Sequence, residues 1–225
     1  MTTFRTFWEG LDWSIVTNAL ISVVPALLCI TFHEVSHGFV AYRLGDPTAK
    51  EAGRLTFNPI KHIDIFGLLM MVVLHFGWAK PVPVNMNRFR NPKAGMAITA
   101  LAGPVSNVLL AAVMLVISLL FYMHGSGSVT YWIARLAAQT AWLSIALGIF
   151  NLVPISPLDG SKVLFSFLPD NLYNLLMHYE RYGMILLFIV IWTGVLGEPL
   201  GIATEAVFDW MWNGLASIFG GAVYG

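Results

Sequence analysis

Long runs of apolar residues dominate the chain and predict helices that cross a membrane. Ser14 to Leu44 is nearly continuous apolar sequence, and it would be about 46 Å long as a helix that rises about 1.5 Å per residue. Further apolar runs follow it: Met96 to Met123, Tyr131 to Val153, Gly183 to Leu196 with its flanks, and Ala203 to Phe219. Glu205 and Asp209 in the last run make a helix on the membrane surface as plausible as a fifth span.

The segment Ile63 to Phe76 is apolar but, at about 14 residues, too short to cross a bilayer as a straight helix. Its glycines and β-branched residues favour a re-entrant loop or hairpin, which lipid tolerates only where protein covers it. We therefore expect an all-α polytopic membrane protein with about 4–6 transmembrane helices. A re-entrant or β-hairpin segment should lie between the first two spans.

Composition supports this class and excludes others. Of the 225 residues, 57% are hydrophobic and only 11% are charged, whereas a soluble domain has about 25% charged residues. The net charge is zero, so we expect no nucleic-acid partner. The lone cysteine, Cys29, excludes an intrachain disulfide and a zinc site built on several cysteines. With no repeat or linker, residues 1–225 are expected to form one domain.

The basic residues predict the orientation in the membrane. If the three main spans alternate in direction, ten of the twelve basic residues fall on one side: Arg43, Lys50, Arg54, Lys61, Lys80, Arg88, Arg90, Lys93, Lys162 and Arg181. Cytosolic loops of membrane proteins carry such an excess. Residues 45–93 and 158–181 are therefore expected in the cytosol, and the N-terminus outside.

Three polar side chains interrupt the first span in the pattern His33-Glu34-Val35-Ser36-His37. Histidines four residues apart lie on one face of a helix, so both imidazoles can reach one metal ion. Glu34 is placed to act on water at the metal without being a ligand. Because ionisable groups inside a membrane cost about 2.5–3.5 kcal/mol each on insertion scales, the cluster needs a compensating partner.

A catalytic zinc site takes a third protein ligand and keeps one position open. Asp159 is the favoured candidate, because Pro154 and Pro157 end the third span and Gly160 allows a tight turn that directs the carboxylate back at the bundle. The other candidates are His62, Asp64 and His75, whereas His124 falls on the opposite side of the membrane.

These motifs together resemble the site-2 proteases, which are intramembrane zinc metalloproteases. The resemblance covers about residues 14–165 and rests on the HEVSH span, on Ala102-Gly103-Pro104-Val105-Ser106-Asn107, and on Asn151-x-x-Pro154 followed by Leu158-Asp159-Gly160. Residues 58–62 and 77–85 match compact bacterial and archaeal members, without a PDZ or CBS domain. Ser156 departs from the proline of many members, but it touches no predicted ligand.

The resemblance implies that His33, His37 and Asp159 hold one Zn²⁺ per chain and that Glu34 is the catalytic base. It also implies a transmembrane protein as substrate, a lipid bilayer as surroundings and the membrane of a prokaryotic cell as location, with the active site toward the cytosol. Residues 14–165 would be the catalytic core and about 176–222 the C-terminal helices. Association of identical chains stays open.

Two asparagines are candidates for stabilising the oxyanion or positioning the substrate. Asn151 lies about one turn before the helix-ending prolines, and satisfying backbone groups freed by Pro154 is an equal alternative. Asn107 is the weaker candidate, for which a hydrogen bond between helices is the favoured role. Residues 53–87 are expected to face the substrate, in part as an extended strand that pairs with it.

Two other classes of function compete with the protease. An intramembrane metal transporter or sensor would stack its ligands along a route across the membrane. Here the candidate ligands lie near one face, and the outer half of the first span has no polar path. An inactive protease-like scaffold would be expected to lose the glutamate first, and Glu34 is present.

Overall fold

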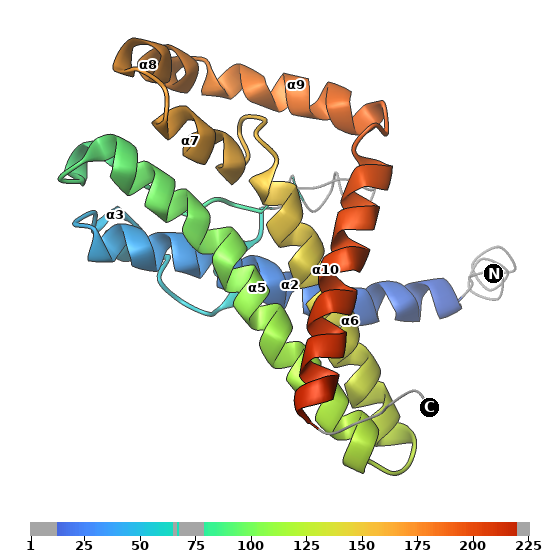
Figure 1. The fold of residues 1–225 in the computed structure, drawn as a ribbon. Coiled ribbons are helices and arrows are strands. Elements are labelled where there is room, and N and C mark those ends of the chain that lie inside the picture. Colours follow the sequence, from blue (N-terminus) through green and yellow to red (C-terminus); the bar gives the residue numbers. More distant parts are fainter. Residues whose placement is uncertain (1–12, 65–66, 68–78, 220–225) are drawn as a thin grey trace, which may run out of the picture.

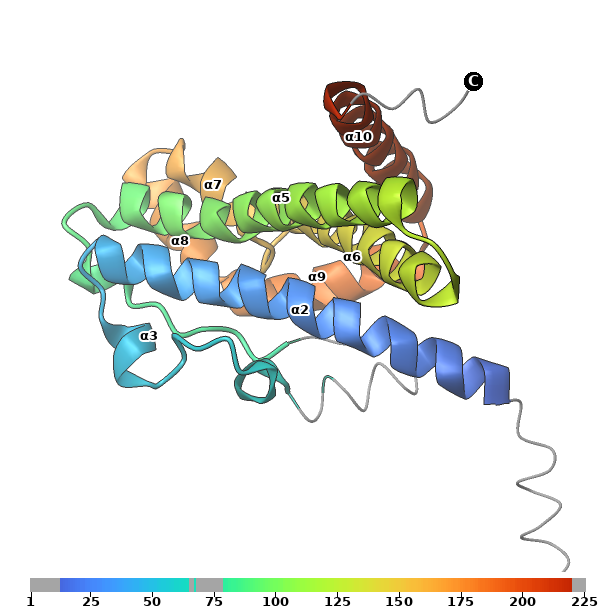
Figure 2. The same cartoon turned by 90° about the horizontal axis from the view of Figure 1, so that it is seen from below.

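Three long helices form the frame of the molecule. The computed structural model describes residues 13–64, 67 and 79–219. Helix α2 (Trp13–Arg43), α5 (Pro92–His124) and α6 (Ser128–Leu152) are the long elements. Helix α5 packs against both α2 and α6, as the two views in Figures 1 and 2 show. Each of the three contains a stretch that is long and apolar enough to cross a membrane, which in α2 is Val23–Arg43.

Short elements connect α2 to α5: α3 (Thr48–Glu51), η1 (Pro59–His62) and η2 (Met86–Arg88). Helix α5 begins with Asn91 as its cap, whose side-chain oxygen accepts from Ala94 N at 3.2 Å, and with Pro92 at its first position. Most of the expected hairpin lies outside the described residues. Its two ends pair through an isolated antiparallel bridge between Ile63 and Ala79.

The C-terminal part is more broken than the sequence predicts. It contains α7 (Asp159–Ser166), α8 (Asp170–His178), α9 (Glu180–Trp192) and α10 (Gly197–Ile218). The predicted fourth span is helical only in α9, and it reaches spanning length only together with α8, which is bent from it by 74°. The described residues thus offer three membrane spans, or up to four, and α10 is not among them.

Small and apolar side chains fill the contact between α5, α6 and α10. Ala111 and Leu115 of α5 and Ala141 of α6 are fully buried, and Ile145 and Met211 complete the cluster. Since lipid is as apolar as these side chains, close packing rather than exclusion of water stabilises this contact, and the two alanines let the backbones approach.

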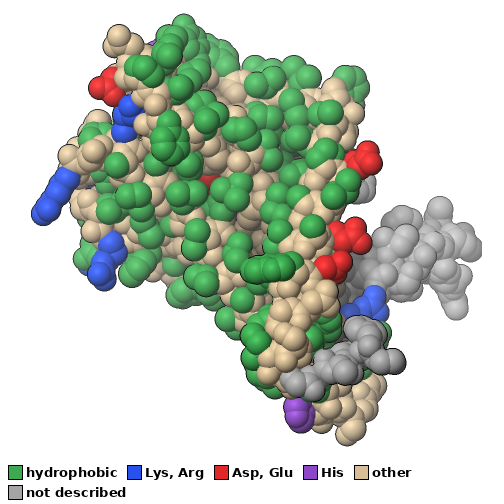
Figure 3. Space-filling model, viewed as in Figure 1, with side chains coloured by type: hydrophobic (Ala, Val, Ile, Leu, Met, Phe, Trp, Pro, Cys, Tyr) green, Lys and Arg blue, Asp and Glu red, His purple; other side chains and the backbone are tan. Residues whose placement is uncertain are grey.

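The outer surface fits a lipid environment. Figure 3 shows hydrophobic side chains over most of one face, with most of the visible Lys and Arg side chains where α3 and the start of α5 lie, and several acidic ones along α10. On α5, Leu109 is 63% exposed and Val113 is 55% exposed. The protein is therefore an all-helical, polytopic membrane protein in the residues described.

Candidate metal centre and active site

The polar residues of α2 lie in its second half, where the helix runs against α5. His33 and His37 are one turn apart and only 5% and 9% exposed, respectively. Both face inward because residues four apart share one side of a helix. The structure therefore places the two predicted ligand histidines together inside the helix bundle.

Asp159 reaches the same place from α7. Helix α6 ends at Leu152, and the chain turns through Pro154 and Pro157 before α7 begins at Asp159 itself. Gly160 makes this return path possible: a Cβ atom there would lie 2.1 Å from the carbonyl oxygen of Leu152. The turn brings the Asp159 carboxylate, 8% exposed, against the two imidazoles.

Three possible ligand atoms converge within this cluster. The Nε2 atoms of His33 and His37 are 3.0 Å apart, and each lies 3.1 Å from Oδ2 of Asp159. Atoms bound at about 2.0–2.1 Å to one tetrahedral zinc lie about 3.3 Å from one another, so the triangle is close to the size that zinc requires. In the part of the chain that is described, these three residues are the group of His, Cys, Asp and Glu side chains that could hold a metal.

The hydrogen bond on the far side of the His37 ring determines which ring nitrogen carries the proton. Its Nδ1 lies 2.7 Å from the carbonyl oxygen of Thr99 on α5, and because a carbonyl only accepts, Nδ1 carries the proton. In the neutral ring, Nε2 then presents a lone pair to the Asp159 carboxylate. Two lone pairs at this distance repel each other unless a cation lies between them.

The donor set therefore fits a metal ion. Oδ2 of Asp159 is buried without a hydrogen-bond partner, although two ring nitrogens lie beside it. A proton could serve one of these contacts, whereas a single divalent cation serves all three atoms at once. Two imidazoles and one carboxylate, with a position left for water, are a known ligand set of catalytic zinc.

Gly103 of α5 leaves the space in which both rings sit. A Cβ atom at this position would lie 2.5 Å from Cε1 of His33 and 2.5 Å from Nε2 of His37. No side chain fits there without moving the imidazoles. Gly103 thus shapes the cluster directly, in addition to allowing α2 and α5 to pack closely.

Glu34 lies beside the cluster, at the edge of a pocket of about 310 Å³. The pocket is lined by His33, Glu34, His37 and Asp159, and further residues from the 81–84 segment and from α5, α6, α7 and α9 contribute to it. Oε2 of Glu34 accepts a hydrogen bond from Val82 N at 2.8 Å. The carboxylate is thereby held toward the pocket and is not one of the three converging ligand groups.

Residues 81–84 form one wall of the pocket. This segment is anchored by Asp46, which is fully buried. Its carboxylate accepts from Asn85 N at 2.6 Å, from Thr48 N at 3.0 Å and from the Thr48 hydroxyl. Burial alone would raise the pKa of Asp46, but the hydrogen bonds from Thr48 and Asn85 and the nearby charge of Arg88 outweigh it, so the pKa lies below its usual value.

The two predicted asparagines have different surroundings. Asn151 lines the pocket, and its Nδ2 donates to the carbonyl oxygen of Leu147 at 2.9 Å, one turn back on α6. Asn107 is fully buried behind the His33 ring, with Nδ2 at 3.2 Å from Nδ1. It makes the hydrogen bond between helices that the sequence favoured.

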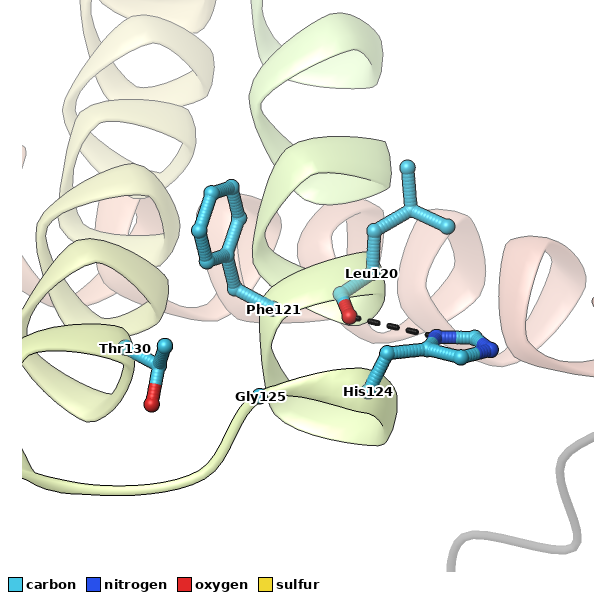
Figure 4. A pocket seen from close by; sticks show the side chains of 5 residues that line it. All are labelled: Leu120, Phe121, His124, Gly125 and Thr130. Carbon is cyan, nitrogen blue, oxygen red and sulfur yellow. Dashed lines mark hydrogen bonds between the residues drawn. The ribbon is translucent and has the colours of Figure 1, made fainter.

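The competing third ligands lie elsewhere. His62 is buried, and its Nε2 contacts the carbonyl oxygen of Thr56 at 2.9 Å. Asp64 accepts from Gly67 N, and His75 lies outside the described residues. His124 belongs to a different pocket, at the turn from α5 to α6, where its ring contacts the Leu120 carbonyl of its own helix (Figure 4).

Sequence reasoning missed three residues that contribute to the site. Thr99 acts through its backbone carbonyl, so its side chain carries no signal for that role. Lys162 and Glu180, which line the pocket and form an ion pair at 3.5 Å, come from α7 and the first turn of α9. The i to i+3 spacing of Asp159 and Lys162 could have indicated that Lys162 shares a helix face with the carboxylate.

The chain is similar to known zinc metalloproteases. Residues 120–193 match the family described as Peptidase family M50, a range that contains Asn151 and Asp159. A protein of Bacillus subtilis named "Putative zinc metalloprotease YwhC" is 38% identical over 179 residues, which are 78% of this chain and 81% of that protein. The identically described MJ0611 of Methanocaldococcus jannaschii is 32% identical over 146 residues, 64% of this chain and 69% of that protein.

A more distant relative has the same description. Rip2 of Mycolicibacterium smegmatis is 26% identical over 183 residues, which are 80% of this chain and 69% of that protein. No solved structure matches the chain. The length and identity of these matches show that the chain belongs to peptidase family M50, the site-2 proteases, and is a zinc metalloendopeptidase.

Proposed function

We propose that this protein is an intramembrane endopeptidase that hydrolyses peptide bonds in or near the transmembrane helices of other membrane proteins. One observation carries the proposal: two imidazole nitrogens and a carboxylate oxygen converge within 3.1 Å inside a bundle of helices long and apolar enough to span a bilayer. A buried polar cluster of this kind is energetically costly in a membrane. Ionisable residues at such a place therefore indicate a functional site.

In this proposal, His33, His37 and Asp159 hold the zinc ion that the family requires, and Glu34 is the catalytic base. When bound by these residues, zinc would supply Lewis-acid polarisation of the scissile carbonyl and would make a water molecule acidic enough to attack near neutral pH. Glu34 accepts the proton of the attacking water and returns it to the leaving amine. Its contact with Val82 N holds the carboxylate at the pocket for both transfers.

Asn151 is the proposed side-chain donor for the oxyanion. Its amide lines the pocket with the ligands, but it now donates to Leu147 on its own helix. Rotation of the side chain would free this donor for a developing negative charge on the substrate oxygen. The helix retains its own backbone hydrogen bonds when the side chain leaves, so the rotation has a small cost.

The extended wall of the pocket is the proposed binding surface for the substrate backbone. Residues 81–84 are held at one end by Asp46 through Asn85 and contact Glu34 through Val82. A transmembrane helix must unwind before its carbonyls can be attacked, and an extended partner strand compensates for the lost helical hydrogen bonds. Cleavage therefore takes place on a locally extended substrate.

The orientation and the extent of the unit are also proposals. The excess of basic residues in 45–93 and 158–181 supports a site that opens toward the cytosol, and the bacterial and archaeal relatives support the membrane of a prokaryotic cell. Residues 1–225 would then form one protease domain, with its catalytic core at about 14–165 and the remaining helices at about 176–222.

Cleavage of a defined membrane substrate tests the proposal. Purified wild type and the Glu34→Gln variant would be incubated in proteoliposomes with a set of single-span model proteins, and with casein as a soluble control. We expect wild-type products whose termini, read by mass spectrometry, fall within the transmembrane segments, and about 10²–10⁴-fold slower cleavage by the variant. Cleavage of casein alone, or equal rates for the two proteins, would contradict the proposal.

A further inference from the structure

Both rings of the metal centre are supported from behind by one stripe of α5. Thr99, Gly103 and Asn107 follow one another at intervals of four residues, so they lie on the same face of the helix. Thr99 contacts Nδ1 of His37, Gly103 leaves the space that both rings occupy, and Asn107 contacts Nδ1 of His33. Three positions of α5, each one turn from the next, thus line the two histidines that are one turn apart on α2.

The two supports differ in chemistry. His37 is held by a backbone carbonyl, which can only accept and which every residue type at position 99 would supply. His33 faces the side-chain amide of Asn107, which can present either its NH₂ group or its oxygen. The tautomer of His33 therefore depends on the identity of one side chain.

A metal on Nε2 of His33 requires the proton of the neutral ring to be on Nδ1, where it needs an acceptor. The amide of Asn107 is the partner at that position, and its Oδ1 is buried with no hydrogen-bond partner of its own. Rotation by 180° about Cβ–Cγ exchanges the oxygen and the nitrogen of the amide at almost the same positions. The unpaired oxygen then accepts from Nδ1–H of His33.

We propose that Asn107 is a positioning residue that holds His33 in the zinc-binding tautomer through this hydrogen bond to Nδ1. The inference rests on the zinc site proposed above and adds a residue to it that touches neither the metal nor the substrate. This role replaces the one expected from the sequence, in which Asn107 would stabilise the oxyanion. The amide lies behind the ring of His33 rather than in the pocket.

The surroundings keep the amide in place. Asn107 is 0% exposed, and its backbone carbonyl accepts from the Ser144 hydroxyl at 2.8 Å across the contact between α5 and α6. A Cβ atom at Gly148 would lie 3.4 Å from Cβ of Asn107, so the side chain also has little room on the α6 side. The amide is therefore confined to the His33 ring whichever way it is turned.

Zinc affinity of the detergent-solubilised protein tests the inference without any substrate. We would measure the dissociation constant by competition with a chromogenic chelator in wild type, Asn107→Leu, Asn107→Asp and Ser144→Ala. Removing an outer-shell acceptor typically weakens metal binding by about 10–100-fold, which we expect for Asn107→Leu. Asn107→Asp keeps an acceptor and should bind zinc within a few-fold of wild type. Ser144→Ala removes the hydrogen bond to the backbone of Asn107 but keeps the amide, so it should weaken zinc binding much less than Asn107→Leu does.

The absorption spectrum of bound Co²⁺ gives a second readout. We expect the tetrahedral visible bands of wild type in Asn107→Asp and weaker or shifted bands in Asn107→Leu. If the leucine variant does not fold, Asn107→Ala replaces it, with folding checked by thermal unfolding of the metal-free protein.

Equal zinc affinity in wild type and the leucine or alanine variant would overturn the inference, and so would an equal loss in Ser144→Ala. Loss of zinc in the aspartate variant would overturn it as well. If wild type itself binds no zinc, the proposed metal site fails along with the inference. If wild type binds zinc and the leucine variant binds it equally well, the proposed metal site holds and only the role of Asn107 is contradicted.

Discussion

Helix α5 contacts its neighbours in two different ways along its length. From Thr99 to Asn107 it contacts the histidines of α2 through the Thr99 carbonyl and the Asn107 amide, and Gly103 leaves space for both rings. From Ala111 to Leu115 it packs against α6 and α10 through apolar groups, and both of these residues are fully buried. In the first region the outward-facing nitrogen of each imidazole has one defined partner. The second region requires only that side chains fill the space between the helices.

This difference teaches how a membrane protein can hold a polar site. In the apolar region a changed side chain is compensated by its neighbours, because the contacts have no direction. In the polar region a shift of about 1 Å breaks a hydrogen bond or a ligand contact outright. Substitutions in the first region should therefore act on the metal, and those in the second on stability.

Gly103→Ala should give the largest effect, because the new Cβ would occupy space within 2.5 Å of both rings. We expect zinc affinity to fall by about 100-fold or more, beyond the loss of an outer-shell partner. Gly214→Ala is the matched control on α10, where an added Cβ meets no atom within 4 Å. Chelator competition on both variants measures the difference, and an equal effect of the two would erase the distinction between the regions.

Leu115→Ala should leave zinc bound and lower stability. The side chain is fully buried between α5 and its neighbours, so its loss leaves a cavity. We expect the free energy of unfolding to drop by about 2 kcal/mol, the low end for such truncations, because burial away from lipid gives no gain from water exclusion. Unfolding in a denaturing detergent, followed together with zinc content, tests this. Loss of zinc in the folded variant would contradict it.

Asp46→Asn should have the smallest effect, and one that depends on pH. The pKa of Asp46 is depressed in the folded protein, so its carboxylate stabilises the fold above the unfolded pKa of about 3.9, and the contribution is lost as the pH falls below that value. We expect the variant to be about 1 kcal/mol less stable at pH 7, because a lone amide oxygen satisfies fewer of the three donors.

Thermal unfolding of both proteins between pH 7 and pH 3 measures the pH dependence of this difference. The gap between wild type and variant should shrink toward the acid end of the range. A gap that stays constant with pH would show that the charge of Asp46 does not stabilise the wall of the pocket.

The sequence predicted the parts of the site that follow from local geometry. The spacing of His33 and His37 places them on one face of any helix, and the prolines and Gly160 indicate a turn that returns Asp159 to the bundle. The contacts of Gly103 and Thr99 could not be predicted in the same way. They depend on the register between α2 and α5, which side-chain identity at those positions does not encode.

The helical spans were predicted less evenly. The bounds of α5 and α6 agree with their apolar runs to within a few residues. In the C-terminal part, the apolar run from Gly183 to Leu196 crosses a break, because α9 ends at Trp192 and Gly194 has a φ of +71°. A glycine in that conformation ends a helix at no steric cost, and a count of apolar residues does not detect it.

Zinc content tests the central claim most directly, because it requires no knowledge of the substrate. Wild type and Asp159→Ala would be purified in detergent without chelator and analysed by atomic emission. The account predicts about one zinc per chain in wild type and a loss in the variant, since a catalytic site needs all three ligands. Equal zinc in both proteins, or none in wild type, would contradict the assignment of His33, His37 and Asp159 as the metal site.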